Sequence, residues 1–180
     1  EMKCRALLTN MNNYFWTEQG KETDFIANGD IAVVRRFRRE RELYGFRFAD
    51  VLLRFPDYND LELEVKLLLD TLHTDTPALP KEMGDRLYQS VMEDYADITI
   101  KRERMKKLKA DPQYNALQVK YAYAITCHKA QGGQWKRVFL DQGYMTEEML
   151  SPDYFRWLYT AFTRATETLY LVNWPKEQTE

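Results

Sequence analysis

Short runs of alternating apolar and polar residues dominate the first third of the chain and predict β-strands there. One strand is expected at residues 4–9, and the turn formers Asn28-Gly29-Asp30 stand directly before a second at residues 31–34. The partly alternating residues 45–55 and the alternating residues 61–65 predict two more strands, separated by a proline turn. Strands of this length joined by turns suit a small β-barrel.

The period of the apolar positions lengthens after this region. Apolar side chains recur at the four-residue spacing of a buried helical stripe, at Met83, Leu87, Val91 and Tyr95. Pro80 stands where a helix can begin, and Asp111-Pro112 stands where helix is disfavoured. The pattern predicts a helical insert from Pro80 to about Lys109.

Strand and helix patterns alternate over the C-terminal part of the chain. Strands are predicted at residues 117–119, 121–125, 138–140 and 168–173. A helix is expected to start after the turn Gly132-Gly133, and another runs from the N-cap Ser151 to about Ala165. The order strand, helix, strand, helix, strand favours a parallel α/β sheet, with Trp135 and Trp157 in its core.

The composition narrows the class of protein. The 180 residues suffice for one ordinary domain or two small ones, and 44% hydrophobic with 30% charged residues excludes wholesale disorder. No apolar run approaches the roughly 18 residues of a membrane-spanning helix, so a soluble protein without a membrane partner is expected. The formal net charge is −2, so any affinity for nucleic acid must come from local clusters.

The cysteines and histidines point to a reducing compartment. Cys4 and Cys127 lie far apart, and no secretory leader pattern precedes them, which predicts a cytoplasmic setting without a disulfide framework. With only His73 and His128 beside them, no metal site is expected. The chain opens on Glu1 and enters an apolar run at once, as a segment of a longer protein does.

Two basic clusters concentrate positive charge. Five arginines follow the Asn-Gly-Asp turn, at Arg35, Arg36, Arg38, Arg39 and Arg41. They either bind nucleic-acid phosphates or form a solvated hairpin tip that Glu40 and Glu42 neutralise. Residues 101–109 hold six Lys and Arg against Glu103, again as a phosphate-binding or a merely solvated face. The aromatic run at residues 14–16 either stacks on bases or packs beneath the barrel.

Two C-terminal segments carry candidate chemistry. Residues 124–133 lead from a strand into a polar glycine turn, at a sheet edge where α/β folds bind ligands. Backbone amides freed by the glycines, together with Lys129, suit a phosphate or nucleic acid, and a solvated polar turn is the alternative. Residues 159–165 place Arg164 near a helix end, where it either meets a ligand or satisfies the terminal carbonyls.

The order and spacing of these two segments resemble the C-terminal motor domain of superfamily 1 helicases. Residues 126–132, Thr-Cys-His-Lys-Ala-Gln-Gly, look like motif V, and residues 159–165, Tyr-Thr-Ala-Phe-Thr-Arg-Ala, look like motif VI. Residues 12–16 and 25–31 resemble the stretch at which RecD-like helicases enter an inserted SH3-like barrel. The resemblance is closest to this group, which includes the alpha subunit of exodeoxyribonuclease V and has a UvrD-like C-terminal domain.

The resemblance extends roughly over residues 1–55 and 115–175 and implies a divided α/β fold. A parallel-sheet RecA-like domain of the P-loop NTPase type, the second motor domain, is expected at residues 1–27 and 113–180. An inserted SH3-like barrel with a helical extension is expected at residues 28–112.

The family's functional residues map onto matching positions. Arg164 is the expected arginine finger, because its planar, permanently charged fork suits the γ-phosphate of ATP. The expected ATP-binding residues are Gln131, Gly132, Gln134 and Arg164. The expected DNA-binding residues are Thr126, His128 and Lys129, with Asn28, Arg35, Arg36 and Arg38 on the barrel. Many relatives carry glutamate where Gln134 stands, so the local charge differs in this chain.

The chain lacks the P-loop pattern, since its only Gly-Lys pair, Gly20-Lys21, is followed by Glu22. ATP and Mg²⁺ are therefore expected in the full-length enzyme, with the Mg²⁺ ligands outside this chain, and the chain alone should not hydrolyse ATP. The expected partners are single-stranded DNA, an N-terminal RecA-like domain of the same polypeptide, and nuclease or repair proteins.

The function implied by the resemblance is 5′ to 3′ unwinding by an ATP-dependent DNA helicase. This chain would supply the arginine finger and part of the single-strand track. The alternative is a non-catalytic nucleic-acid-binding or protein-docking module with a helicase-derived fold. A third interpretation is half of an RNA helicase or of a plasmid-relaxase helicase.

Overall fold

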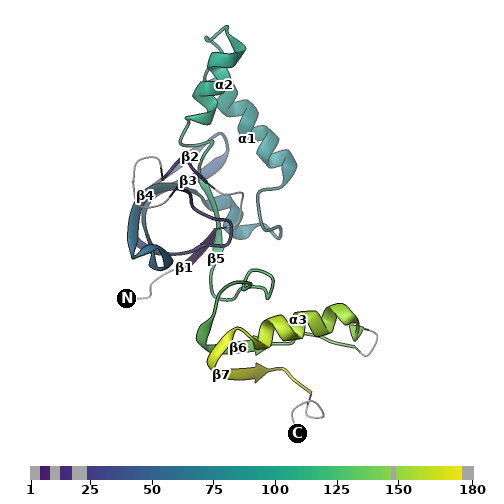
Figure 1. Ribbon diagram of the computed structural model, residues 1–180. Coiled ribbons are helices and arrows are strands. Elements are labelled where there is room, and N and C mark those ends of the chain that lie inside the picture. The colour runs from purple at the N-terminus through teal and green to yellow at the C-terminus, as the bar shows by residue number, and fades with distance from the viewer. Residues whose placement is uncertain (1–4, 9–12, 18–23, 147–148, 176–180) are drawn as a thin grey trace. The chain divides into compact units, whose positions relative to one another are not determined.

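The computed structural model describes residues 5–8, 13–17, 24–146 and 149–175. The chain divides into two compact units, Glu1–Tyr123 and Ala124–Glu180. We call the first the barrel unit and the second the C-terminal unit (Figure 1).

Strands of the barrel unit close into a barrel (Figure 1). In ring order they are β1 (Arg5–Leu8), β2 (Ile31–Leu43), β3 (Phe46–Phe55), β4 (Leu61–Leu68) and β5 (Leu117–Tyr121). Neighbouring strands pair antiparallel except β4 and β5, which run parallel, and β5 pairs with β1 to complete the ring. The strands predicted from alternation and turn signals in this part of the chain are confirmed.

The barrel interior is apolar because alternate residues of each strand point inward. Leu53 and Phe55 of β3 and Val119 of β5 are at most 1% exposed. Trp16 packs against this core, and its Nε1–H donates to the Asn115 carbonyl at 2.8 Å. Of the two roles considered for this aromatic run, Trp16 therefore has the packing role.

β2 is longer than its sequence pattern predicts. Apolar residues mark only positions 31–34, whereas pairing with β3 continues to the last residue of β2. Residues 35–42 are exposed throughout, so no buried face imposes an apolar period on them. Register shifts make bulges at Arg35 and Arg38, which increase the local twist of the strand.

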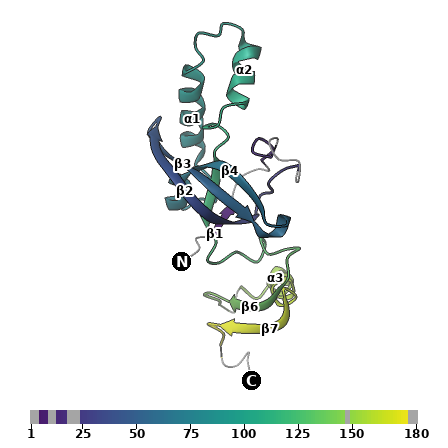
Figure 2. The same ribbon diagram turned by 90° about the vertical axis from the view of Figure 1, so that its left-hand side faces the viewer.

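A second apolar cluster joins the barrel to two helices, α1 (Lys81–Glu93) and α2 (Lys101–Lys109), which form a hairpin (Figure 2). Its buried members are Phe46, Phe48, Leu68, Leu87, Val91 and Leu108. The predicted helical insert and its apolar stripe are confirmed. The insert is interrupted between the helices, where the β-branched residues 98–100 have lower helix propensity.

Short 3₁₀ turns, η1 (Pro56–Tyr58) and η2 (Leu69–His73), flank β4. The hydroxyl of Thr71 in η2 reaches the point at which the ring closes. It donates to the Leu68 carbonyl at 2.7 Å and accepts from Val119 N–H at 3.1 Å. Because β4 and β5 share only a short parallel register at Leu67 and Leu68, this hydroxyl reinforces the closure.

Thr71→Val is expected to lower the free energy of unfolding of the barrel unit by about 1 to 3 kcal/mol. The side chain is fully buried, and valine keeps its shape while removing the partner of two buried backbone groups. Urea denaturation followed by circular dichroism measures the change. Thr71→Ser keeps the hydroxyl and should cost less; equal losses in both variants would contradict the hydrogen-bond explanation.

The C-terminal unit contains β6 (Trp135–Asp141), α3 (Pro152–Phe162) and β7 (Ala165–Val172). β6 and β7 pair in parallel, and α3 lies on one side of them (Figures 1 and 2). The predicted parallel arrangement is therefore present for these two strands. In the described part of the chain, no helix is long and apolar enough to cross a membrane.

Three local expectations for this half of the chain are wrong. The strand predicted at residues 121–125 ends at Tyr121, and β6 rather than a helix follows the glycine pair, beginning at Trp135. Gly132 has a φ of +85°, which is incompatible with an α-helix. Trp135, expected in the core, is 39% exposed because it opens β6 beside the loop, whereas Trp157 is half-buried.

The boundary between the compact units differs from the expected domain division. β1 and β5 lie in segments assigned to the RecA-like domain, yet they complete the barrel between β2 and β4. Their backbone groups pair with these strands, which would otherwise present open edges. The compact barrel unit therefore spans more of the chain than residues 28–112.

Candidate functional site

Residues 126–133 fold into consecutive turns that lead into β6, and we call them the turn loop. Ala130 N–H donates to the carbonyls of Thr126 and Cys127, each at 3.1 Å. Ala130 is buried, whereas the side chains of Thr126, His128 and Lys129 are exposed. The loop is therefore anchored at its centre and presents its expected DNA-binding residues to solvent.

The phosphate cradle expected from free backbone amides is smaller than the sequence predicts. The amides of Ala130, Gln131 and Gly133 donate to carbonyls within the loop. The loop leads into β6 and not into a helix, so it offers no helix dipole to an anion. A phosphate here would be held mainly by side chains.

α3 begins as its sequence predicts and ends slightly earlier. Ser151 is the N-cap, its Oγ accepts Tyr154 N–H at 3.3 Å, and Pro152 occupies the first turn. The helix ends at Phe162, so Arg164 lies just beyond it instead of in its last turn. The Thr163 hydroxyl donates to the Tyr159 carbonyl at 2.9 Å and satisfies part of the helix end.

Arg164 ties α3 to the turn loop. Its Nη1–H donates to the Gly133 carbonyl at 2.9 Å. Its Nε–H donates to the Thr160 carbonyl and its Nη2–H to Thr163 Oγ1, each at 2.9 Å. The capping role considered for this arginine is present. Each Nη carries one further N–H for which the described residues provide no acceptor, so two donors stay available to a ligand.

Cys127 lies half-buried at the start of the turn loop, with Sγ 3.5 Å from the Trp157 carbonyl. Burial raises the pKa of the Cys127 thiol, and the positive charge of Arg164 opposes this shift. The thiol is therefore protonated at neutral pH and serves as a weak donor to α3 rather than as a nucleophile.

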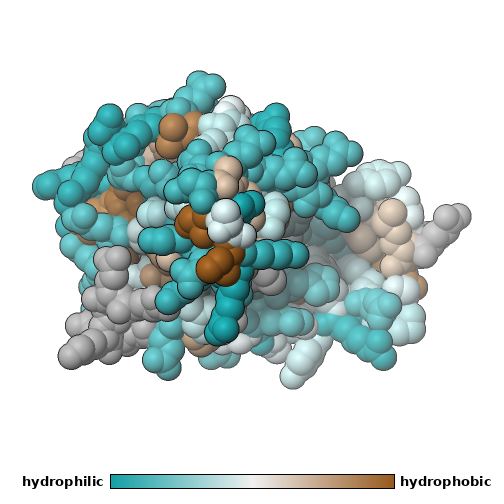
Figure 3. All heavy atoms as spheres, turned by 90° about the horizontal axis from the view of Figure 1, so that it is seen from above, coloured by the Kyte–Doolittle hydropathy of each residue, from teal (hydrophilic) through white to brown (hydrophobic). Residues whose placement is uncertain are grey.

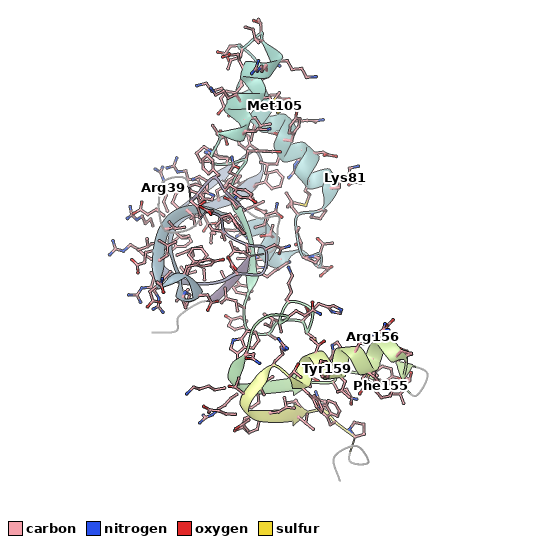
Figure 4. The ribbon with its side chains drawn as sticks, in the orientation of Figure 1. Arg39, Lys81, Met105, Phe155, Arg156 and Tyr159 are labelled. Atoms are coloured by element: carbon pink, nitrogen blue, oxygen red, sulfur yellow. The ribbon has the colours of Figure 1, made fainter. Side chains whose placement is uncertain are left out.

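A groove of about 330 Å³ runs between the turn loop and α3. It is lined by Cys127, His128, Gln131, Asp153, Arg156, Trp157 and Thr160. Arg156 Nη1 lies 2.8 Å from Asp153 Oδ1, and Figure 4 shows Arg156 on α3 with Phe155 and Tyr159. His128 and Gln131, expected on the DNA side and the nucleotide side, thus line the same groove.

The α3 residues of this groove were missed from the sequence. Asp153, Arg156, Trp157 and Thr160 were not among the candidate site residues. Their spacing of three and four residues, which places them on one helix face, was the available signal. It could not be used without knowing which face of α3 meets the turn loop.

The other expected ATP-binding residues lie within or next to the turn loop. Gln131, Gly132 and Gln134 are exposed, and Arg164 reaches the same loop through the Gly133 carbonyl. Gln131 lines the groove, whereas Gly132 and Gln134 do not. Among the described residues, no group of three or more His, Cys, Asp and Glu side chains is placed to hold a metal ion.

Most of the arginine cluster on β2 is neutralised by carboxylates of neighbouring strands. Arg35 Nε lies 3.4 Å from Glu62 Oε1, and Arg38 forms an ion pair with Glu64. Arg41 Nη2 lies 3.7 Å from Asp50 Oδ2. The neutralising partners are thus on β3 and β4, and not the neighbouring Glu40 and Glu42 that the sequence suggested.

Arg36 and Arg39 differ from these paired arginines. Both are exposed, and neither forms an ion pair with a described residue. Arg39, labelled in Figure 4, lines an open depression of about 470 Å³ together with Trp16 and Arg38. The free positive charge of β2 is therefore concentrated at Arg36 and Arg39.

Asn28 belongs to a turn with a structural role. Asp30 Oδ2 accepts Ala27 N–H and the Tyr58 hydroxyl, each at 2.7 Å. Burial, and then this hydrogen bond to Asp30, raise the pKa of Tyr58 to about 12. Gly29, at a φ of +105°, donates its N–H to the Leu8 carbonyl at the end of β1. The turn thus joins β1 to β2 and leaves the Asn28 side chain exposed.

Residues 121–172 match the family model of the UvrD-like helicase C-terminal domain. The matched segment contains the turn loop, α3, Arg164 and the paired strands β6 and β7, whereas most of the barrel lies outside it. A comparison with curated proteins found no match. The C-terminal unit is therefore similar to a helicase C-terminal domain.

Proposed function

We propose that this chain is the second motor domain of an ATP-dependent DNA helicase of the RecD-like kind, with a RecA-like C-terminal domain and an SH3-like barrel. The observation that carries the proposal is the hydrogen bond from Arg164 Nη1 to the Gly133 carbonyl. It joins Arg164, in the segment that resembles motif VI, to the residue directly after the segment that resembles motif V, and both segments lie in the part matched by the helicase family model. A nucleotide bound at one segment can therefore act on the other.

Arg164 is the proposed arginine finger. Three hydrogen bonds hold its guanidinium at the junction of α3 and the turn loop, which lowers the entropy lost when a phosphate binds. The two remaining N–H groups fit a bidentate contact with phosphate oxygens. Closure of the N-terminal RecA-like domain onto ATP would bring the γ-phosphate to these donors, where they stabilise the charge of the transferring phosphoryl group.

The residues of the turn loop divide the remaining work in this proposal. Gln131, Gly132 and Gln134 face the nucleotide, while Thr126, His128 and Lys129 hold single-stranded DNA. A small movement of Arg164 would shift the loop through the Gly133 carbonyl, so a change at the nucleotide reaches the DNA-binding side chains. Each cycle then advances the strand by one step, in the 5′ to 3′ direction that the family resemblance suggests.

The barrel contributes a further part of the proposed DNA track through Asn28, Arg35, Arg36 and Arg38. Arg36 is available at once, because no described carboxylate neutralises it. Arg35 and Arg38 would have to exchange Glu62 and Glu64 for phosphates, so each adds less affinity.

ATP and Mg²⁺ belong to the full-length enzyme in this proposal. The donors of Arg164 fit a phosphate, but the described residues contain no cluster that fits Mg²⁺. The magnesium ligands and the P-loop would come from an N-terminal RecA-like domain, and nuclease or repair proteins are the proposed further partners.

The test measures ATP turnover by the full-length protein with and without oligo(dT). A strand-displacement assay then compares duplexes blocked at the 5′ end with duplexes blocked at the 3′ end. We expect turnover to rise with oligo(dT) and displacement to occur in the 5′ to 3′ direction. An oligo(rU) competitor separates DNA from RNA preference. Binding of oligo(dT) without any turnover would contradict the motor proposal and favour the non-catalytic binding module.

A further inference from the structure

The basic helix α2 carries positive charge that nothing in the described part of the chain neutralises. Its sequence, KRERMKKLK, has six Lys and Arg against one Glu. Lys101, Arg102, Lys106, Lys107 and Lys109 are exposed, and none forms an ion pair with a described residue. The end of the barrel unit that carries this hairpin is mostly hydrophilic (Figure 3).

Only some of these charges serve the stability of the helix: Lys106, Lys107 and Lys109 lie in its last turn, where the helix dipole favours cations. Lys101 and Arg102 stand at its N-terminus, where the helix dipole disfavours cations, and no side chain caps this end. Arg102 and Lys106, four residues apart, repel each other by a few tenths of a kcal/mol. The helix is held instead by the fully buried Leu108 and by hydrogen bonds from Arg104 to the Ile98 carbonyl. Helix stability therefore does not account for the cations of the first turn, Lys101 and Arg102.

A comparison with β2 indicates a role for the unpaired cations of α2. Both clusters belong to the barrel unit and are rich in basic residues, but carboxylates lie beside Arg35, Arg38 and Arg41 on β2. On α2, Glu103 is the single acidic residue among the nine. A strand whose arginines are already paired gains little from a polyanion, whereas an unpaired cluster gains the full release of counterions.

From the geometry and charge of this helix we infer that α2 is a nucleic-acid backbone-binding surface, contacting phosphates through Lys101, Arg102, Lys106 and Lys109. These four side chains, with Glu103 and Met105, line an open depression of about 810 Å³ (Met105 is labelled in Figure 4). The inference rests on the proposed nucleic-acid function of the chain. It assigns a larger share of the affinity to α2 than to the paired arginines of β2.

The composition of the surface favours nucleic acid over an acidic protein. The centre of a protein interface is enriched in aromatic residues and depleted of lysine. α2 has no aromatic residue, and its one apolar side chain at the depression, Met105, is half-buried against the second apolar cluster. What remains exposed is a set of cations suited to phosphates of any sequence.

The experiment measures binding of fluorescein-labelled oligo(dT) to the full-length protein by anisotropy, at several salt concentrations between about 50 and 200 mM. The variant is Arg102→Gln/Lys106→Gln, which removes a repelling pair of exposed charges and so should keep the fold. The control is Arg41→Gln/Arg47→Gln, which changes the net charge equally but at arginines paired with Asp50 and Glu40. Circular dichroism verifies that both variants fold.

We expect the α2 variant to bind about tenfold more weakly at low salt and to lower the steepness of the salt dependence by about 1.4, because two side chains no longer neutralise phosphates of the single strand. The control should change both quantities much less. Equal effects in the two variants, or an unchanged salt dependence in the α2 variant, would overturn the inference.

Stimulation of ATP turnover by saturating oligo(dT) is measured in parallel. If it is normal while α2 has no effect on binding, only this inference fails; if turnover is absent, the proposed motor function fails.

Discussion

Arg164→Ala in the full-length protein is expected to lower single-strand-stimulated ATP turnover by about 10³-fold or more while oligo(dT) still binds. Alanine removes the guanidinium that stabilises the negative charge developing on the transferring phosphoryl group. Water cannot replace this guanidinium in a closed cleft. Turnover is measured at saturating ATP and oligo(dT), and binding by anisotropy. Arg137→Ala, which removes an exposed arginine of β6, serves as the control and should turn over near the wild-type rate.

The structural role of Arg164 requires a second variant. Alanine also removes hydrogen bonds to Gly133, Thr160 and Thr163, so the C-terminal unit could lose activity by loosening. Arg164→Lys keeps the charge but cannot donate in the same fork. We expect it to remain folded, by its thermal unfolding profile, and to be strongly impaired in turnover. Wild-type turnover in a folded Arg164→Ala protein would remove this residue from the catalytic step.

Phe55→Ala is expected to lower the free energy of unfolding of the barrel unit by about 3 to 5 kcal/mol. Phe55 is 1% exposed at the end of β3, packs in the barrel core, and lies edge-on to Tyr58 at 6.1 Å between ring centroids. Alanine removes most of the buried ring area and leaves a cavity that the closed ring of strands cannot collapse around. This loss is a large fraction of the stability of an ordinary domain.

The control for this prediction is Phe37→Ala in β2 of the same barrel. Phe37 is 54% exposed and belongs to neither apolar cluster, so its truncation should have only a small effect. Urea denaturation followed by circular dichroism compares both variants with the wild-type protein. Similar losses in Phe37→Ala and Phe55→Ala would mean that the barrel interior is not the main source of stability of the unit.

The predictable parts of the fold are those whose sequence period reflects a buried face. Alternation identified β3 and β4, and the four-residue stripe containing Leu87 and Val91 identified the helical insert. The outer part of β2 escaped prediction because residues 35–42 have no buried face and are held by backbone pairing with β3 and by ion pairs to β3 and β4. The helix expected after the glycine pair is absent because Gly132, at a positive φ, ends the turns and the chain then enters β6.

The candidate site shows the same division. Polar residues and glycines at family-like spacing singled out Thr126, His128, Gln131 and Arg164 from the chain alone. The facing residues of α3, such as Arg156 and Trp157, could not be found this way, since a helix sequence does not state which face meets the turn loop. The ion pairs of β2 were likewise hidden, because Glu62 and Glu64 lie far along the chain from Arg35 and Arg38.

The amino-acid sequence alone specifies which segments are strands and helices with a buried face, where the candidate motif residues lie, and where positive charge accumulates. These are local properties, set by side-chain period, turn chemistry and composition. Folding in three dimensions was needed to establish that β1 and β5 close the barrel, that Arg164 reaches Gly133, and that the cations of β2 are largely paired while those of α2 are not. Such facts depend on contacts between distant residues, which only the folded chain brings within a few ångströms.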